Sequence, residues 1–400
     1  MQPVESSDSL KGSHMKKTLI VAAVAASFAT AANAQSSVTL YGLVDAGFSY
    51  VNNEAAPNTA KGSAAAFRVS SGNLNGSRWG LRGTEDLGGG MKAIFTLESG
   101  FSMGNGSALQ GGRQFGRQAF AGISTAQMGT VTLGRQYDSV VDYLAPMTAN
   151  GSWGGTYFSH PFDNDNTQNS FRVNNSVKYQ SANYSGLTFG GLYGFSNQAG
   201  GFANNRAYSA GAQYANGPFK IAAAYLQLQN PSSSNTSGAV TDAGGAANTL
   251  ATIAGTSVQT QRTYGAGASY AIGPVTVGGA WTQSRFQFIG GDSTARFNNY
   301  EVNARYALTP ALALGAAYTY TDVKGYTTGP DNNGHVKFHQ FGLQTDYALS
   351  KRTDIYAEGV VQLAKQGAVA EIYGTGSNGA GSPAAHGNQV VVSTGIRHRF

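Results

Sequence analysis

Cysteine is absent from the 400-residue chain, so neither a disulfide bond nor a thiolate metal site can form. Charged residues are scarce at 12%. Beyond the first 34 residues no apolar run approaches the ~18 residues that a transmembrane helix needs. The net charge is +6, but the basic side chains are dispersed, which argues against a nucleic-acid-binding protein. Disulfide-stabilised domains, helical membrane proteins and nucleic-acid binders are therefore all disfavoured.

Glycine and aromatic residues are abundant, with 55 Gly, 21 Tyr and 20 Phe at a mean hydropathy of −0.23. A membrane β-barrel has this composition, because alternate side chains of each strand face lipid and water. The C-terminal stretch VVVSTGIRHRF shows the alternation, with Ser, Gly and two Arg on one face. The other face carries Val390, Val392, Thr394, Ile396, His398 and Phe400.

The N-terminal region has the features of an export signal. Residues 15–34 read MKKTLIVAAVAASFATAANA, with two lysines, an apolar run and a small-x-small cleavage site, so the mature chain is expected to start at Gln35. Residues 1–14 precede the signal. They are either an expression-tag remnant or an over-long start-site assignment, and we favour the second. We expect residues 35–400 to form one barrel domain outside the cytoplasm.

Alternation and turn residues predict sixteen strands, joined alternately by short turns and by long loops rich in Gly, Ser and Asn. Short turns on one side and long loops on the other are typical of an antiparallel transmembrane β-barrel, and an even strand count returns both termini to the periplasmic side. A soluble β-sandwich or adhesin is the alternative, because the same alternation can face a dry core. The expected strands are 38–52, 67–86, 90–102, 113–126, 130–137, 170–183, 187–197, 207–217, 218–230, 261–273, 274–288, 296–309, 310–325, 336–350, 351–367 and 388–400.

Several long motifs resemble the Gram-negative general porins: SSVTLYGLVDAGFSY, SRWGLRGTEDLGGGMKAIFTLESGF, GTVTLGRQYD, YALSKRTDIYA and the final RHRF. The resemblance covers about 38–400. It implies a homotrimeric sixteen-stranded barrel in the outer membrane, surrounded by lipopolysaccharide and lipid, that passes small ions and hydrophilic solutes. It also implies that Phe400 is part of the signal read by the barrel-assembly machinery.

In porins the third long loop folds inward and narrows the channel, and the loop 138–169 occupies that place here. By resemblance, Asp142 matches the acidic position of the constriction, and Asp138 is a second acidic candidate. Met147 stands where relatives often hold another carboxylate, so this constriction is expected to be less acidic than theirs.

The opposing wall is expected to be basic. An arginine facing hydrocarbon costs roughly 2–4 kcal/mol near the bilayer midplane, so strand arginines should face water. Alternation predicts that the following residues face lipid: Trp79, Leu81, Phe120, Val173, Val177 and Tyr179. It predicts that the following residues face the lumen: Arg78, Arg82, Arg117, Arg172 and Lys178. Of these, Arg78, Arg117 and Arg172 match the arginine ladder of the family.

No catalytic, cofactor or metal site is expected. The histidines are scattered, and no strand pairs a serine with a histidine on one face. The stretch DNDN at 163–166 resembles half a calcium loop but lacks the glycine and the distal glutamate. We therefore expect a passive diffusion porin with weak-to-moderate anion preference. The alternatives are a substrate-specific anion channel of the same fold and an adhesin with a plugged barrel.

Overall fold

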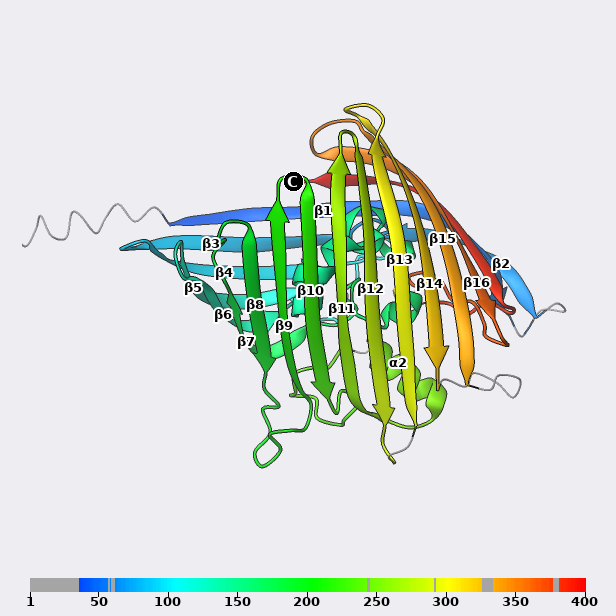
Figure 1. The fold of residues 1–400 in the computed structure, drawn as a ribbon, viewed down its shortest axis with the longest axis horizontal. Helices are drawn as coiled ribbons and strands as arrows, with labels where there is room; N and C mark the ends of the chain where they lie inside the picture. The colour runs from blue at the N-terminus through cyan, green and yellow to red at the C-terminus, as the bar shows by residue number, and fades with distance from the viewer. Residues whose placement is uncertain are drawn as a thin grey trace, which may run out of the picture.

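The computed structural model describes residues 36–400 apart from 57, 59–61, 243–244, 291–292, 326–333 and 377–380. The expected signal peptide and the N-terminal extension lie outside these residues. The described chain is nearly all β-structure, wound into a barrel whose strands lie side by side (Figure 1).

The structure has seventeen strand segments. They are β1 (Ser37–Ala55), β2 (Ser63–Ser71), β3 (Arg78–Gly88), β4 (Met91–Gly100), β5 (Gln118–Thr125), β6 (Gly129–Gln136), β7 (Val173–Gln180), β8 (Leu187–Gly194), β9 (Arg206–Asn216), β10 (Phe219–Gln229), β11 (Val258–Ile272), β12 (Val275–Phe288), β13 (Thr294–Ala307), β14 (Leu312–Lys324), β15 (His335–Ala348), β16 (Thr353–Lys365) and β17 (Asn388–Arg399).

Every neighbouring pair is antiparallel, and β17 pairs with β1 to close the sheet. Phe400 completes this seam, because Gly42 and Phe400 exchange backbone hydrogen bonds of 3.1 and 3.0 Å. Closure leaves no open edge along the seam, which a hydrocarbon environment requires. The sixteen-stranded antiparallel barrel expected from the sequence is confirmed, since β2 and β3 share one position beside β1.

The expected strand 67–86 is interrupted between β2 and β3. Gly72 has φ +79, and a Cβ there would lie 2.7 Å from the Cα of Gly76, so the chain turns sharply. Leu74 and Asn75 then donate backbone hydrogen bonds of 2.9 and 2.8 Å to the carboxylate of Asp45. This buried carboxylate on β1 replaces the ladder partners that the strand loses.

Two side-chain orientations expected from alternation are wrong. Phe120 pairs in register with Thr96, which pairs with the lumen-facing Arg82, so Phe120 lies on the inner face. Val173 is completely buried and packs inward with Val140.

Irregular backbone explains the error at Val173, whereas the error at Phe120 comes from extending the alternation to Arg117, which lies before the regular ladder of β5. The ladder between β6 and β7 has a bulge between Gly134 and Gln136, and Asn175 adopts φ +51 within β7. One extra residue reverses the face of all residues beyond it. Arg117 reaches the inner side because it precedes the first residue of β5.

Helical structure is confined to loops. The helix α2 (Ala246–Ala254) lies in the long connection between β10 and β11 and ends at Gly255, whose left-handed φ of 65 permits the C-cap. The loop between β6 and β7 contains five short turns: η1 (Val140–Leu144), η2 (Ala145–Met147), η3 (Asn150–Gly154), η4 (Thr156–Phe158) and η5 (Pro161–Asp163). No helix among the described residues is long and apolar enough to span a membrane.

Candidate functional site

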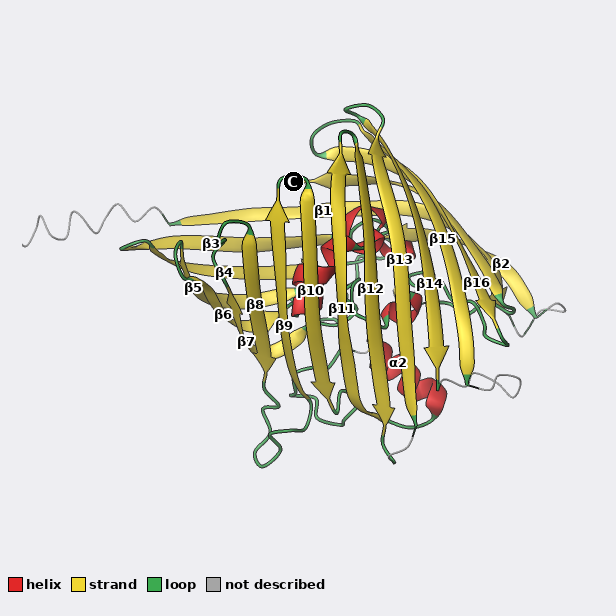
Figure 2. Ribbon diagram, in the orientation of Figure 1, coloured by secondary structure: helices red, strands yellow, loops and turns green. Residues whose placement is uncertain are grey.

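The loop between β6 and β7, residues 137–172, folds into the interior of the barrel. Its helical turns lie behind the front strands in Figure 2, enclosed by the sheet. It contacts opposite parts of the wall, with η1 packed on β9–β11 and its later residues hydrogen-bonded to β12–β15. The loop therefore crosses and narrows the lumen, which is the position that the porin resemblance implied for 138–169.

The first part of the loop is held by apolar contacts. Val140 and Leu144 of η1 are completely buried in a cluster with Leu226 of β10. Glycines on the wall permit the approach, since a Cβ on Gly211 would lie 2.6 Å from the ring of Tyr143. This attachment mainly buries hydrocarbon, and Asp142 of η1 adds one ion pair with Lys178 of β7.

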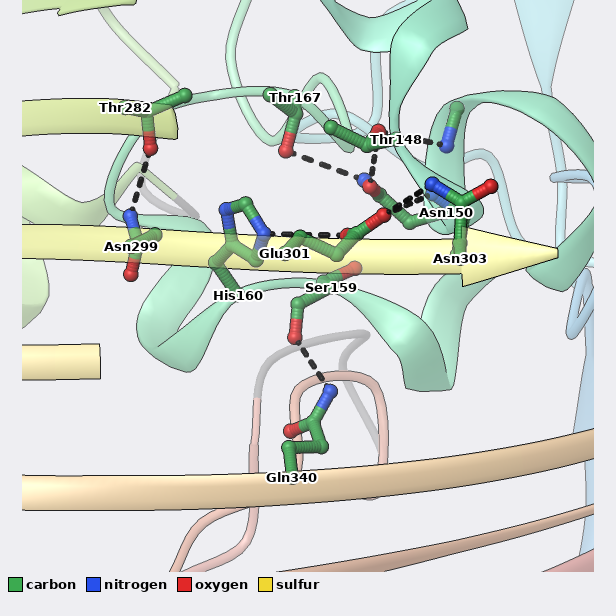
Figure 3. Close-up of polar contacts among 12 residues, drawn as sticks. Thr148, Asn150, Ser159, His160, Thr167, Thr282, Asn299, Glu301, Asn303 and Gln340 are labelled. Carbon is green, nitrogen blue, oxygen red and sulfur yellow. Dashed lines mark hydrogen bonds and ion pairs between the residues drawn. The ribbon is translucent and has the colours of Figure 1, made fainter. Parts of the chain in front are cut away.

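The later part of the loop is held by a buried charge network (Figure 3). The ring of His160 donates from Nδ1 to Asp165 at 2.6 Å and from Nε2 to Glu301 of β13 at 3.2 Å. The second oxygen of Glu301 accepts hydrogen bonds of 2.7 Å from the backbone N–H of Ala149 and from Asn303. One strand carboxylate thus fixes two separate points of the loop.

Amides and hydroxyls extend this network along neighbouring strands. Thr282 of β12 donates to Asp165 at 2.6 Å, and Asn299 of β13 donates to Asn164 at 2.9 Å. Gln340 of β15 donates to the carbonyl of Ser159 at 3.0 Å (Figure 3). The wall from β12 to β15 is therefore complementary to the loop.

The electrostatics of the network keep His160 charged. Burial would lower the pKa of His160, but the charges and hydrogen bonds of Asp165 and Glu301 outweigh it and raise the pKa to about 10. Burial would raise the pKa of Asp165, but its attraction and hydrogen bond to His160 lower the pKa to about 2. Burial, together with the charge of Asp165, raises the pKa of Asp163 to about 7. An imidazolium is thus held between two carboxylates.

The two predicted acidic residues do not face an opposing basic wall. Asp142 forms an ion pair with Lys178 of β7, so this predicted pair lies on one wall and not across the lumen. Asp138 is completely buried and accepts hydrogen bonds from the Val140 backbone at 2.8 Å and from Asn166 at 2.6 Å. Asp138 therefore stabilises the base of the loop.

Met147 is also buried, packed against the wall at Gly267. Within the DNDN stretch, Asp163 serves the loop itself, since it accepts backbone hydrogen bonds from Gln168 and Ser170 at 2.9 and 3.0 Å, whereas Asn164 and Asp165 bond to the wall.

The predicted arginines gather on the wall from β3 to β7. Arg117 binds Glu98 through Nε at 2.7 Å and donates to the hydroxyl of Tyr137 at 3.0 Å. The guanidinium of Arg172 lies over the ring of Tyr137 at 5.9 Å. Arg78 is close enough to Arg117 and Glu98 to interact electrostatically with both. Arg78, Arg117 and Arg172 thus form one cluster around Tyr137.

The cluster members differ in exposure. Arg117 and Arg172 are 8% and 5% exposed, whereas Arg78 is half-buried. Arg82 is exposed four residues along β3 toward the short-turn end, with its guanidinium 4.9 Å from the ring of Tyr41. The surface offered to a solute is therefore mainly Arg78 and Arg82, with the other two arginines reinforcing the positive field.

Sequence reasoning missed several members of the site. The sequence shows the histidines as scattered and marks neither His160 nor Glu301, because their contact joins residues 141 positions apart. Alternation alone would have directed Glu301 inward. Arg113 and Arg135, which share the carboxylate of Asp242 at 2.9 and 2.7 Å, require knowledge of how the loop 230–257 folds.

Comparison with known proteins identifies the family. The family model described as Gram-negative porin matches residues 21–365. The chain belongs to this porin family. It is 34% identical to an outer membrane porin protein of Bordetella pertussis and 31% identical to outer membrane porin protein 32 of Delftia acidovorans. Both alignments cover 96% of this chain and 100% of the relative.

Solved outer-membrane protein structures have the same fold. The structure titled anion-selective porin from Comamonas acidovorans matches with a TM-score of 0.71 and 26% identity, over 92% of this chain and 100% of that one. OmpT of Vibrio cholerae matches with a TM-score of 0.63 at 14% identity, over 91% and 98% of the two chains. This porin is therefore a multi-pass channel protein of the Gram-negative outer membrane.

Proposed function

We propose that this porin admits small hydrophilic solutes and ions by passive diffusion, with a weak-to-moderate preference for anions. The observation that carries the proposal is the imbalance of charge on the wall from β3 to β7 and its adjoining loops. This region has eight basic side chains: Arg78, Arg82, Lys92, Arg113, Arg117, Arg135, Arg172 and Lys178. Within the described residues, only three carboxylates form ion pairs with them: Glu98, Asp142 and Asp242.

Unpaired cations beside a narrow aqueous path raise the local concentration of anions and lower that of cations. The neutralisation of Asp142 by Lys178 removes the acidic counterpart that would balance the arginines. The anion-selective title of the Comamonas acidovorans structure supports the same sign. Solvent screens the exposed Arg82, and the buried Arg117 is paired with Glu98. We therefore expect the preference for anions to be moderate.

The remaining parts of the proposal concern partners. The outer face of β1 and β2 exposes Phe48, Phe67 and Val69 at 50%, 66% and 69%, an apolar surface that fits the homotrimer implied by the porin resemblance. Phe400 is 45% exposed on the lipid-facing side, where the barrel-assembly machinery can read it. We also infer that the chain is not an enzyme, since the role found for His160 is attachment of the loop.

The test is a single-channel recording of the refolded mature chain in a planar bilayer under a KCl gradient. We expect triplet conductance steps and a reversal potential on the anion side. A cation-side potential would refute the anion preference but not the proposal that the protein is a diffusion channel. Conductance that saturates with a millimolar organic anion would identify the substrate-specific alternative, and absence of current from folded protein would favour the plugged adhesin.

A further inference from the structure

The wall formed by β15, β16, β17 and β1 carries a buried carboxylate without a partner. Alternate residues of β16 are buried, and Glu358 lies among them with Asp354 and Tyr356, so its side chain faces the interior of the barrel. Glu358 is 4% exposed, and neither of its carboxylate oxygens accepts a hydrogen bond of normal geometry from the described residues. Such a buried carboxylate is strongly destabilising unless something neutralises it.

The other carboxylates on the inner face of this wall are satisfied by the chain itself. Asp45 of β1 accepts a hydrogen bond of 2.6 Å from Tyr356 and two more from backbone N–H groups. Ion pairs with arginine satisfy the remaining three: Glu54, Asp346 and Asp354. Glu358 therefore differs from its neighbours, because no arginine or lysine among the described residues pairs with it.

The neighbours of Glu358 in register are neutral. They are Gln344 on β15 and Ser393 on β17, and directly opposed side chains on adjacent strands have Cβ atoms about 4.5–5.5 Å apart. The amide of Gln344 interacts with the carboxylate, but its Nε2 donates to the carbonyl of Gly154 in the inward loop at 3.4 Å. The Oε1 of Gln344 is the amide atom that this hydrogen bond leaves free.

A hydroxyl of the inward loop lies beside the same carboxylate. Tyr157 of η4 is close enough to Glu358 to interact with it electrostatically. Its hydroxyl is held by Ser49 of β1 at 2.8 Å. Ser393 accepts hydrogen bonds from Ser49 at 3.1 Å and from Asn73 at 2.6 Å, which uses both of its lone pairs. The protein oxygens available around Glu358 are thus its own two, the hydroxyl of Tyr157 and the amide oxygen of Gln344.

Oxygen atoms with one unneutralised carboxylate are the surroundings that a hard metal cation prefers. The described residues contain no group of three or more His, Cys, Asp or Glu side chains that could hold a metal ion. The single negative charge of Glu358 therefore matches a monovalent cation better than a divalent one.

We propose that Glu358, with the hydroxyl of Tyr157 and the amide oxygen of Gln344, binds a monovalent metal cation such as Na⁺. The cation neutralises the buried carboxylate and joins β15 and β16 to the inward loop through Tyr157. It provides a third attachment of the loop, beside the apolar contacts of η1 and the network around His160. The site is separate from the arginine cluster on which the proposed anion preference rests.

The test measures detachment of the inward loop in two salts of equal ionic strength, sodium chloride and tetramethylammonium chloride. Tetramethylammonium has the charge of Na⁺ but is too large for a buried site. Trp153 lies next to Gly154, so its fluorescence during urea titration reports detachment once Trp79 and Trp281 are replaced by Phe. We expect detachment to be about tenfold less favourable in the sodium salt, which is the effect of a cation at about ten times its dissociation constant. Equal detachment in the two salts would overturn the proposal.

Glu358→Gln should abolish the difference between the salts. In tetramethylammonium chloride this variant should hold the loop at least as firmly as the parent, because it removes an unpaired buried charge. The matched control, Glu85→Gln, removes one exposed carboxylate of β3 near its short turn and should keep the difference. A difference that survives Glu358→Gln would assign it to a general salt effect and overturn the site.

The reversal potential separates this inference from the proposed function. Under a KCl gradient, Glu358→Gln should keep a potential on the anion side, since the arginine cluster is unchanged. Loss of the sodium effect and loss of the anion preference are thus measured independently.

Discussion

The lumen has two walls that use charged side chains differently. From β3 to β7 the basic side chains outnumber the carboxylates paired with them, and Arg82 is left exposed. From β12 to β15 the charges that touch the inward loop are buried and matched, with His160 between Asp165 and Glu301. Unmatched charge creates a field that a permeating ion experiences, whereas matched and buried charge holds a structural element in place.

The largest effect should come from removing a carboxylate of the buried network that holds the loop to the wall from β12 to β15. Glu301→Ala removes one carboxylate of a buried network and leaves the other groups desolvated, which should cost about 3–5 kcal/mol of loop attachment. Trp153 lies in the loop and packs on Phe158, so its fluorescence during urea titration reports detachment once Trp79 and Trp281 are replaced by Phe. Glu301→Gln is the control and should cost less, since it keeps an acceptor for Ala149. Equal urea midpoints for Glu301→Ala and the parent would contradict the attachment role.

The apolar attachment of the same loop offers the next comparison. Leu144→Ala should cost about 2–5 kcal/mol, because it removes buried methyl groups and leaves a cavity against β10. Leu144→Met, which conserves volume, should cost less than about 1.5 kcal/mol. In contrast to the charged network, this cost should not change with salt or pH. A strong salt dependence of the Leu144→Ala effect in the Trp153 assay would contradict the distinction between the two attachments.

The charged attachment should also depend on pH. His160 has a folded pKa of about 10 against an ordinary 6.5, so its contribution is full below pH 6.5 and is lost as the pH rises toward 10. The pKa of Asp163 is raised from 3.8 to about 7, so its contribution is lost as the pH rises from 3.8 to about 7. Asp165, lowered from 3.8 to about 2, contributes above pH 3.8 and loses that contribution as the pH falls toward 2.

Loop attachment should therefore be strongest near pH 4, weaker at pH 7 and weaker still at pH 9 in the Trp153 assay. His160→Gln should remove the part of the decline between pH 6.5 and 10. A decline that persists unchanged in this variant would assign it to another group.

The smallest effect should come from one exposed charge on the unmatched wall. Arg82 is exposed and makes no ion pair among the described residues, so solvent screens it. Arg82→Gln should lower the chloride-to-potassium permeability ratio by less than about twofold at 0.1 M salt, with a smaller change at 1 M. Bilayer recordings at the two salt concentrations measure this. A change that is larger at 1 M would show that Arg82 acts through structure and not through charge.

The strands could be predicted from the sequence because a period of two and Gly- or Pro-containing turns are local signals. The inward Arg78 and the outward Trp79 followed directly from that alternation. Prediction failed where the backbone breaks the period. The bulge at Gly134–Gln136 and the left-handed Asn175 reversed the face of Val173.

The interior of the site was harder to predict, because the inward loop has no periodic pattern. Its attachment joins His160 to Glu301 and Leu144 to Leu226, pairs far apart in the chain. The ion pair of Asp142 with Lys178 was missed for a different reason: resemblance assigned each residue to a wall but could not give their separation. Prediction of the site therefore requires a three-dimensional structure, whereas the barrel could be predicted from the sequence.

The central claim is that Arg78, Arg117 and Arg172 give the channel its preference for anions. The most direct test is the reversal potential, under a KCl gradient, of a variant in which all three are replaced by Gln, compared with the wild type and with Lys351→Gln/Arg352→Gln as the charge control. We predict an anion-side potential for the wild type and the control, and a shift to zero or to the cation side for the triple variant. An unchanged anion-side potential in a correctly folded triple variant would contradict the account.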